Sequence, residues 1–348
     1  MKRALSLTLA LAATVAIALV AGRAEAAPTA STDTNLTGAG ATFPFPLISK
    51  WIPELGKAYG INVTYSPIGS GGGISAITAR TVDFGASDAP LSSSQLDACK
   101  GCLVIPWALS ATSVPYNLPG IGGRLKLDGP TLANIYLGQI TNWNDPAIRR
   151  MNTGLNLPDL RITPVYRSDG SGTTYNFTEY LSSVSPAFRS GVGFNTSVSW
   201  KTGVGARGSS GVTGVVRQTP GALTYVDVAY SIQNKLQFAT IRNRAGKFAT
   251  PGLRGIQQAL SQLPAKVTSL SQLKTVDPPT KAGKLAYPIT TFTYVIVPTS
   301  SSKAADLRKM VYWAVTQGQK FGPPLLFQPL PKTVQAFAFR EIKKIGST

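Results

Sequence analysis

Four short segments of the chain carry the residue types that hold a small oxyanion. Three of them place glycine and small hydroxyl residues directly before a stretch with helical spacing of apolar residues, and the fourth places an acidic residue directly after a buried strand. Helix N-termini expose backbone N–H groups and a partial positive charge, so they bind phosphate or sulfate without needing a lysine. The segments are residues 38–43 (GAGATF), 69–73 (GSGGG), 167–173 (RSDGSGT) and 85–88 (GASD).

Each segment taken alone also fits an ordinary helix cap, because Ser, Thr, Asp and Gly are preferred there in any protein. The combination is more specific. Arg167 offers a planar fork to two oxygens, and Asp88 offers an acceptor that only a protonated anion can use. For Asp88 the alternative is that it caps the following turn at Ala89 and Pro90. The set of donors with one acceptor predicts a site for an anion that carries a proton.

The chain lacks the residues that most other kinds of site need. The 348 residues include no His and only two Cys, which removes the ligands of a structural zinc site and the usual base for a Ser or Cys nucleophile. Two-metal hydrolysis needs clustered ligands, whereas the 15 acidic residues are dispersed. Residues 203–208 match G-x-G-x-x-G, with Asp227 beyond them, but we interpret this segment as a mobile turn and reject a dinucleotide site. We expect no enzyme activity, no cofactor and no metal.

The first 26 residues have the pattern of a secretory signal peptide. Lys2 and Arg3 precede an apolar run over residues 4–20, and the small residues Ala24 and Ala26 end the segment. A membrane anchor is the alternative, but the apolar run is a little short for spanning. We therefore expect export with cleavage after Ala26.

Cys99 and Cys102 form a C-x-x-C pair. In an oxidising compartment this spacing indicates a closed disulfide, and a thiol oxidoreductase is the minority alternative. The loop is so short that its entropic stabilisation lies well below the roughly 3 kcal/mol of a fifteen-residue loop.

The charge is strongly positive, with 34 Lys and Arg against 15 Asp and Glu, a net +19. Residues 230–348 contain 17 of the basic and 3 of the acidic residues. They are not interleaved with a stacking series of aromatic residues, so we expect no nucleic-acid partner. A solvated basic face and contact with an anionic membrane or cell-surface polymer both stay open.

Helices and strands alternate along the chain, which predicts an α/β fold with helices on both faces of its sheets. A proline-rich turn separates the last two predicted helices. Predicted helices cover residues 44–59, 74–77, 131–137, 174–181, 212–217, 304–316 and 333–345, and predicted strands cover 61–65, 82–86, 162–166, 223–226 and 292–297.

The same segments carry a resemblance to a known family. The strings LTGAGATFPFPL, IGSGGGI, TVDFGASDAPL, IYLGQITNWNDPAI and YRSDGSGTTYNFTEYL closely resemble the periplasmic phosphate-binding protein of the high-affinity phosphate ABC transporter. The resemblance runs from Leu36 to about Val334. It implies two α/β lobes with a hinge and a ligand cleft between them. It places residues 27–109 and 288–348 in lobe 1 and residues 110–287 in lobe 2.

The resemblance also assigns roles to single residues. It gives Phe43 a backbone N–H contact and Asp88 the acceptor role, and it pairs Asp169 with Arg167 in support. One departure is Gly71, where close relatives have a second Ser, and the pair of cysteines is another. Carried over position by position, the phosphate contacts of the family fall on Thr42, Phe43, Ser70, Asp88, Arg167, Ser171, Gly172 and Thr173.

The function that the resemblance implies is capture of inorganic phosphate in the periplasm and delivery to the permease subunits of an ABC transporter in the inner membrane. We expect a monomer that works as a binding protein. The alternative is a secreted phosphatase-like or basic cell-surface offshoot of the same family, but the chain lacks the Asp-Ile-Asn-Gly start of the phosphatase-like offshoot.

Overall fold

Two main sheets organise residues 34–346, which are the residues that the computed structural model describes; the expected signal peptide lies outside them. The larger sheet has six strands in the order β10-β4-β14-β3-β1-β2. β1 pairs in parallel with β2 and β3, and β14 runs antiparallel to β3 and β4. Its strands are β1 (Thr34–Gly40), β2 (Ile61–Ser66), β3 (Phe84–Ser87), β4 (Cys102–Ser113), β10 (Val226–Asp227) and β14 (Thr290–Pro298).

The second sheet has five strands in the order β11-β5-β9-β7-β8, and a third has three strands in the order β13-β12-β6. In the second sheet β7 is parallel to both β8 and β9. The strands are β5 (Pro115–Tyr116), β7 (Thr163–Arg167), β8 (Val204–Ala206), β9 (Ala222–Leu223), β11 (Gln237–Phe238), β6 (Lys126–Leu127), β12 (Thr240–Arg242) and β13 (Phe248–Ala249).

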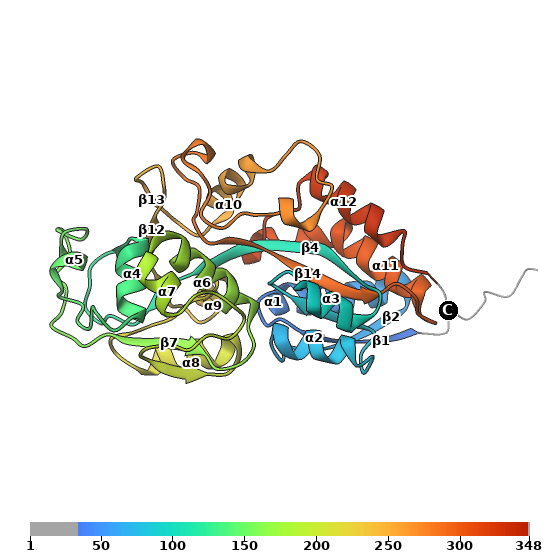
Figure 1. Ribbon diagram of the computed structural model, residues 1–348, viewed down its shortest axis with the longest axis horizontal. Coiled ribbons are helices and arrows are strands. Elements are labelled where there is room, and N and C mark those ends of the chain that lie inside the picture. Colours follow the sequence, from blue (N-terminus) through green and yellow to red (C-terminus); the bar gives the residue numbers. More distant parts are fainter. Residues whose placement is uncertain (1–33, 347–348) are drawn as a thin grey trace, which may run out of the picture. The chain divides into compact units, whose positions relative to one another are not determined.

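Helices from both ends of the chain pack on the six-stranded sheet, and Figure 1 shows the blue elements of the chain start beside the red elements of its end. Other helices pack around the five-stranded sheet. The helices are α1 (Phe45–Tyr59), α2 (Ser70–Thr78), α3 (Ser93–Cys99), α4 (Gly129–Tyr136), α5 (Pro146–Arg149), α6 (Gly172–Val184), α7 (Pro186–Gly191), α8 (Gly208–Gln218), α9 (Val228–Gln233), α10 (Leu253–Ala259), α11 (Ala304–Val315) and α12 (Lys332–Ile342).

Helix α1 shows why these sequences fold locally as they do. Its apolar residues recur at helical spacing, so that one stripe containing Leu47, Trp51 and Leu55 is buried. Trp51 packs edge-on against Trp107 of β4, with ring centroids 5.3 Å apart. The helix ends at Gly60, which adopts a left-handed φ of 64° and donates its N–H to the carbonyl of Gly56.

Aromatic residues also fill the core beside the five-stranded sheet. Phe177 of α6 stacks on Tyr225 with a centroid distance of 4.3 Å, and Tyr136 of α4 meets Phe177 edge-on at 5.1 Å. All three side chains are almost fully buried. They fix α6, whose N-terminus carries several of the predicted site residues, against α4.

The structure departs from the predicted elements in two places near the site. Helix α2 begins at Ser70 and includes the glycine run. Position 73 requires glycine, because a Cβ there would lie 2.4 Å from Cα of Gly40. The segment predicted as one strand over 223–226 forms β9 and β10, which belong to different sheets.

The interpretation of residues 203–208 as a mobile turn is wrong. They form β8 and the start of α8, which leads on to β9. Asp227 caps α9 by accepting a hydrogen bond from the N–H of Ala229, and its side chain is buried. The glycine motif still lacks the dinucleotide arrangement, because β8 lies inside the motif and does not precede it.

Within the described part of the chain, no helix is both long and apolar enough to cross a membrane.

Candidate functional site

Three helix starts bring the predicted anion-binding segments together. Thr42 and Phe43 lie in the turn between β1 and α1, and Ser70 is the first residue of α2. Helix α6 begins at Gly172, and the side chain of its N-cap Ser171 accepts a hydrogen bond from the N–H of Thr174. The first turns of these helices expose backbone donors, as expected for an anion site.

The hydroxyl of Ser70 joins two of these segments. Its Oγ accepts hydrogen bonds from the N–H of Gly172 at 3.0 Å and from the N–H of Asp88 at 3.2 Å. The side-chain amide of Asn176 adds a second link, because its Nδ2 donates to the carbonyl oxygens of Asp88 and Gly172 at 2.7 and 2.8 Å. The start of α6 is therefore locked to the start of α2 and to the residue after β3.

Arg167 is the last residue of β7, and Asp169 holds its guanidinium group. Nε of Arg167 lies 2.7 Å from Oδ1 of Asp169, and Nη2 lies 2.5 Å from Oδ2. The N–H of Gly208 also donates to Oδ1 at 2.9 Å. Burial alone would raise the pKa of Asp169, but the hydrogen bonds and charge of Arg167 and the Gly208 N–H lower it below its ordinary value. The two-point ion pair fixes the direction of the arginine fork.

Asp88 is buried and only partly satisfied. Its side chain is 2% exposed, and Oδ1 has no hydrogen-bond partner among residues 34–346. Burial raises its pKa from 3.8 to about 7, although the hydroxyl groups of Thr293, Thr173 and Ser70 and the charge of Arg167 act in the opposite direction. The turn alternative finds no support, because Ser87 makes the turn contacts: its Oγ donates to the carbonyl of Ala89 and accepts from its N–H.

Thr173, the second residue of α6, also carries a buried polar atom without a hydrogen-bond partner in the described chain. Its side chain is fully buried, and within the described chain its Oγ1 has no hydrogen-bond partner. An unsatisfied buried hydroxyl costs about 1–3 kcal/mol unless a ligand or water completes it. Asp88 and Thr173 thus offer an acceptor and a hydroxyl close to the cation of Arg167.

Sequence reasoning missed several residues of this region. The hydroxyl of Ser209 lies 2.7 Å from Oγ1 of Thr42, and the N–H of Ser209 donates to the same oxygen at 3.3 Å. The hydroxyl of Tyr230 donates to the carbonyl of Thr42 at 2.8 Å. Gly208 and Ser209 start α8, so a glycine and a hydroxyl residue before a helix was the available signal, and the rejection of residues 203–208 as a turn hid it.

Glycines line the contact between the loops at residues 69–71 and 169–172. The N–H of Gly71 donates to the carbonyl of Gly170 at 2.9 Å. A Cβ on Gly71 would lie 3.2 Å from Cα of Gly170, and a Cβ on Gly172 would lie 2.7 Å from Oγ of Ser70. The departure at position 71 therefore has a physical role, because glycine lets the two backbones approach.

The group can bind a small anion, but it does not have the ligands of a metal site. Across residues 34–346, no cluster of three or more His, Cys, Asp and Glu side chains is placed to hold a metal ion.

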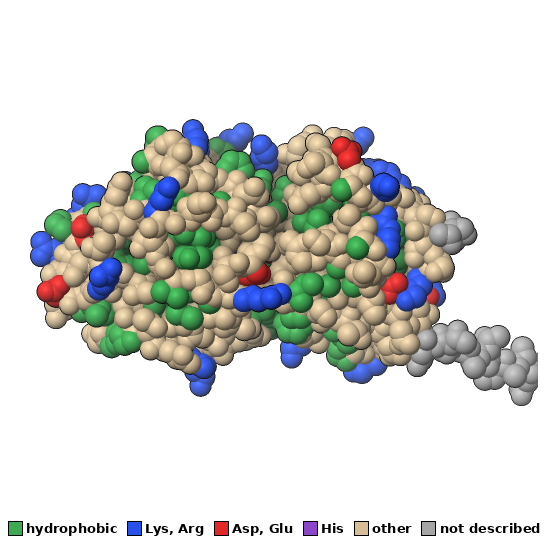
Figure 2. Space-filling model, turned by 60° about the horizontal axis from the view of Figure 1, so that its bottom comes forward, with side chains coloured by type: hydrophobic (Ala, Val, Ile, Leu, Met, Phe, Trp, Pro, Cys, Tyr) green, Lys and Arg blue, Asp and Glu red, His purple; other side chains and the backbone are tan. Residues whose placement is uncertain are grey.

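Figure 2 shows Lys and Arg side chains spread singly over the face in view, with few acidic side chains.

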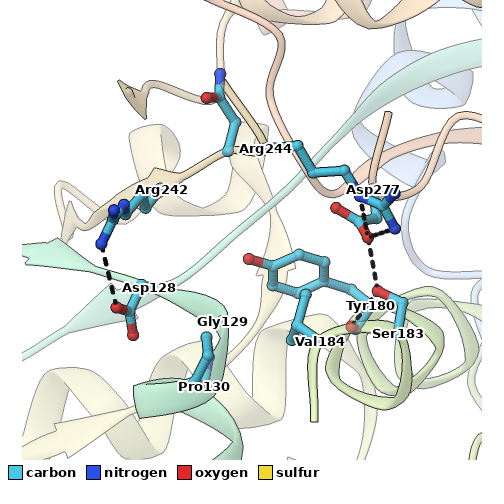
Figure 3. A pocket seen from close by; sticks show the side chains of 10 residues that line it. Asp128, Gly129, Pro130, Tyr180, Ser183, Val184, Arg242, Arg244 and Asp277 are labelled. Atoms are coloured by element: carbon cyan, nitrogen blue, oxygen red, sulfur yellow. Dashed lines mark hydrogen bonds and ion pairs between the residues drawn. The ribbon is translucent and has the colours of Figure 1, made fainter. Parts of the chain in front are cut away.

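The pocket in Figure 3 is not an alternative anion site. It has a volume of about 400 Å³ and lies beside α4 and α6. Its two arginines are already paired: Arg244 lies 2.6 Å from Asp277, and Arg242 lies 4.0 Å from Asp128. Each cation faces its own carboxylate, so the pocket has no excess positive charge for an anion.

Comparison with known proteins identifies the family of the chain. Residues 25–316 match the PBP superfamily domain. The phosphate-binding protein PstS of Xylella fastidiosa (strain Temecula1 / ATCC 700964) is 40% identical over 316 residues, which cover 88% of this chain and 86% of that protein. The phosphate-binding protein PstS of Methanocaldococcus jannaschii is 35% identical over 307 residues, covering 81% of this chain and 78% of that protein.

A solved structure gives the same fold. The phosphate-binding protein of Stenotrophomonas maltophilia matches 88% of this chain and 94% of its own, with a TM-score of 0.68 and 21% identity. The two-lobe α/β fold expected from the sequence is therefore confirmed. By the matched superfamily domain and by the identity to its relatives, this chain belongs to the PBP superfamily and, within it, to the PstS family of phosphate-binding proteins.

Proposed function

We propose that this protein captures inorganic phosphate after export and delivers it to the permease of an ABC transporter. The observation that carries this proposal is the buried Asp88 carboxylate, whose Oδ1 is unpartnered within residues 34–346, placed among the donors of three helix starts. Phosphate keeps a proton at neutral pH and can donate it to this oxygen. The relatives that cover most of the chain are named phosphate-binding proteins.

The proposed ligand contacts follow from the geometry of the segments. Backbone N–H groups at the start of α1, α2 and α6 approach the phosphate oxygens, together with the hydroxyls of Thr42, Ser70 and Thr173 and the fork of Arg167. The full proposed set is Thr42, Phe43, Ser70, Asp88, Arg167, Ser171, Gly172 and Thr173, supported by Asp169 and extended by Ser209.

We assign residues 27–109 and 288–348 to one lobe and residues 110–287 to the other. The first division falls inside β4 and the second falls just before β14, so these two paired strands would carry the hinge. β10 comes from the second segment and pairs with Thr112 and Ser113, the part of β4 that lies on the same side of the division. The proposed form is a monomer in the periplasm, cleaved after Ala26.

Isothermal titration with phosphate, sulfate and arsenate tests the binding function. We expect one phosphate per chain and no measurable sulfate binding at neutral pH. Absence of phosphate binding by the folded protein would overturn the proposal. Turnover of a chromogenic phosphomonoester tests the non-enzyme part of it, and we expect no rate above the uncatalysed background.

A further inference from the structure

The guanidinium group of Arg80 lies against the disulfide between Cys99 and Cys102. Its Nη1 lies 3.5 Å from Sγ of Cys99 and 3.3 Å from Sγ of Cys102. Nη2 donates to the carbonyl oxygens of Cys99 and Lys100 at 2.8 and 3.2 Å. Nη1 also donates to the carbonyl of Ile77 in α2 at 2.7 Å. A fixed positive charge therefore lies beside both sulfur atoms.

The two sulfurs differ in how far they are exposed. Cys99 is the last residue of α3 and is 1% exposed, whereas Cys102 begins β4 and is half-buried. Exchange begins when an external thiolate reaches one sulfur of the disulfide. Cys102 is thus the sulfur that can be attacked, and Cys99 is the sulfur that leaves.

The surroundings favour a thiolate on the leaving sulfur. The cations at this turn are Arg80 and Lys100, and the acidic residue is Asp97 in α3. The C-terminal end of α3 carries a partial negative charge that opposes a thiolate, whereas Arg80 bears a full positive charge 3.5 Å from Sγ of Cys99 and 3.3 Å from Sγ of Cys102. Arg80 therefore favours a thiolate on either sulfur, and the burial of Cys99 makes it the leaving one. Because the disulfide closes a very short loop, chain entropy contributes little to its stability.

We propose that Cys99–Cys102 is a thiol–disulfide exchange site whose substrate is the reduced dithiol of a partner protein. One thiolate of the partner attacks Sγ of Cys102, the Cys99–Cys102 bond breaks, and its electron pair stays on Sγ of Cys99 beside Arg80. The second thiolate of the partner then attacks the partner's own sulfur in the mixed disulfide and releases Cys102. The partner leaves as a disulfide, and this protein gains two electrons and takes two protons from solvent.

The first test measures how fast dithiothreitol reduces the purified protein at neutral pH. The reaction is quenched by alkylation and read by mass spectrometry. Loss of the guanidinium in Arg80→Gln should slow reduction about three- to tenfold and raise the thiol pKa of the reduced protein by about one unit, since a nearby opposite charge moves a pKa by about 1–3 units. Arg80→Lys should restore part of both effects.

The matched control is Arg254→Gln, which removes one exposed arginine from α10 and should leave both measurements unchanged. An Arg80→Gln protein that reduces within twofold of the wild-type rate would overturn the role of Arg80.

The second test uses the wild-type protein and therefore does not depend on the folding of a variant. Glutathione is added, the freed thiol is alkylated at once, and peptides are mapped by mass spectrometry. We expect glutathione on Cys102 and the alkyl group on Cys99. The reverse labelling, or no mixed disulfide at glutathione concentrations that reduce an exposed model disulfide, would overturn the proposal.

Discussion

At the scale of single residues, the selectivity that we propose for the site depends on one proton. Asp88 is a carboxylate in a place where an anion receptor would be expected to avoid negative charge, and its pKa of about 7 means that both forms are present near neutral pH. The ionised form accepts the proton of phosphate and repels sulfate, which has none. The protonated form can donate to either anion. Discrimination therefore belongs to the ionised form.

Replacing Asp88 by Asn tests whether this carboxylate distinguishes phosphate from sulfate by the proton of phosphate. The amide oxygen still accepts from phosphate, and the new NH₂ donates to sulfate, so phosphate should be retained while the phosphate-to-sulfate affinity ratio falls about 10- to 100-fold. Competition titrations above pH 8 measure the ratio. Asp97→Asn removes the same charge from the exposed part of α3 and is the control. An unchanged ratio in Asp88→Asn would assign selectivity to other parts of the site.

The raised pKa of Asp88 also predicts how stability depends on pH. Between pH 3.8 and about 7 the folded protein binds this proton more tightly than the unfolded chain does. The contribution of Asp88 to stability is therefore complete below pH 3.8 and is lost as the pH rises towards 7. In phosphate-free buffer, wild type should lose about 2 kcal/mol more unfolding free energy than Asp88→Asn between pH 5 and pH 7.5. Denaturant titrations at the two pH values check this, and parallel losses would contradict it.

Arg167 depends on shape as well as charge. Asp169 accepts hydrogen bonds from Nε and Nη2 of Arg167, which leaves the rest of the planar guanidinium group for the ligand. A lysine ammonium cannot pair with Asp169 and bind the ligand in the same way. Arg167→Lys should weaken phosphate binding about 10- to 100-fold, the usual loss for a charge-assisted hydrogen bond. Calorimetric titration measures it, with Arg217→Lys in the exposed last turn of α8 as the control. Wild-type affinity would show that backbone donors carry the site.

At the scale of elements, local patterns predicted most of the helices that position the site. The spacing of apolar residues was sufficient to predict α1, α6 and α12, because one face of each helix is buried. The twelve-residue strand β4 was not predicted, because almost all of its residues are buried and no alternation marks it. Tyr230 was not predicted as a site residue either, because a contact across 188 residues leaves no local trace. Ser209 was missed because the segment that leads into α8 was interpreted as a turn.

The glycine contact between the start of α2 and the loop before α6 makes an element-scale prediction. A Cβ on Gly71 would lie 3.2 Å from Cα of Gly170, which is too tight for the two backbones to keep their separation. Gly71→Ala should therefore weaken phosphate binding about three- to tenfold, since mild overpacking costs about 1 kcal/mol or more. Gly214→Ala in α8, where a Cβ meets nothing within 4 Å, is the matched control. Equal affinities for the two variants would contradict this tight contact.

At the scale of the whole molecule, both sets of sheet elements contribute to one site. Thr42 and Ser70 accompany the six-stranded sheet, Arg167 ends a strand of the five-stranded sheet, and hydrogen bonds such as Ser70 to Gly172 cross between the two. Such a site is complete only when its two sides are in contact. We expect phosphate to bind this arrangement better than an open one and so to shift the population towards closure.

Closure is measurable by small-angle X-ray scattering. Adding phosphate should reduce the radius of gyration, and the scattering curve with phosphate should fit the structure of residues 34–346 better than the curve without it. Sulfate at equal ionic strength is the control, because screening of the net +19 charge could by itself alter interparticle scattering. Gly71→Ala should compact less than Gly214→Ala at the same phosphate concentration. If phosphate saturates the protein by calorimetry and the radius of gyration stays constant, binding does not require closure, and the contacts across Ser70 exist before the ligand arrives.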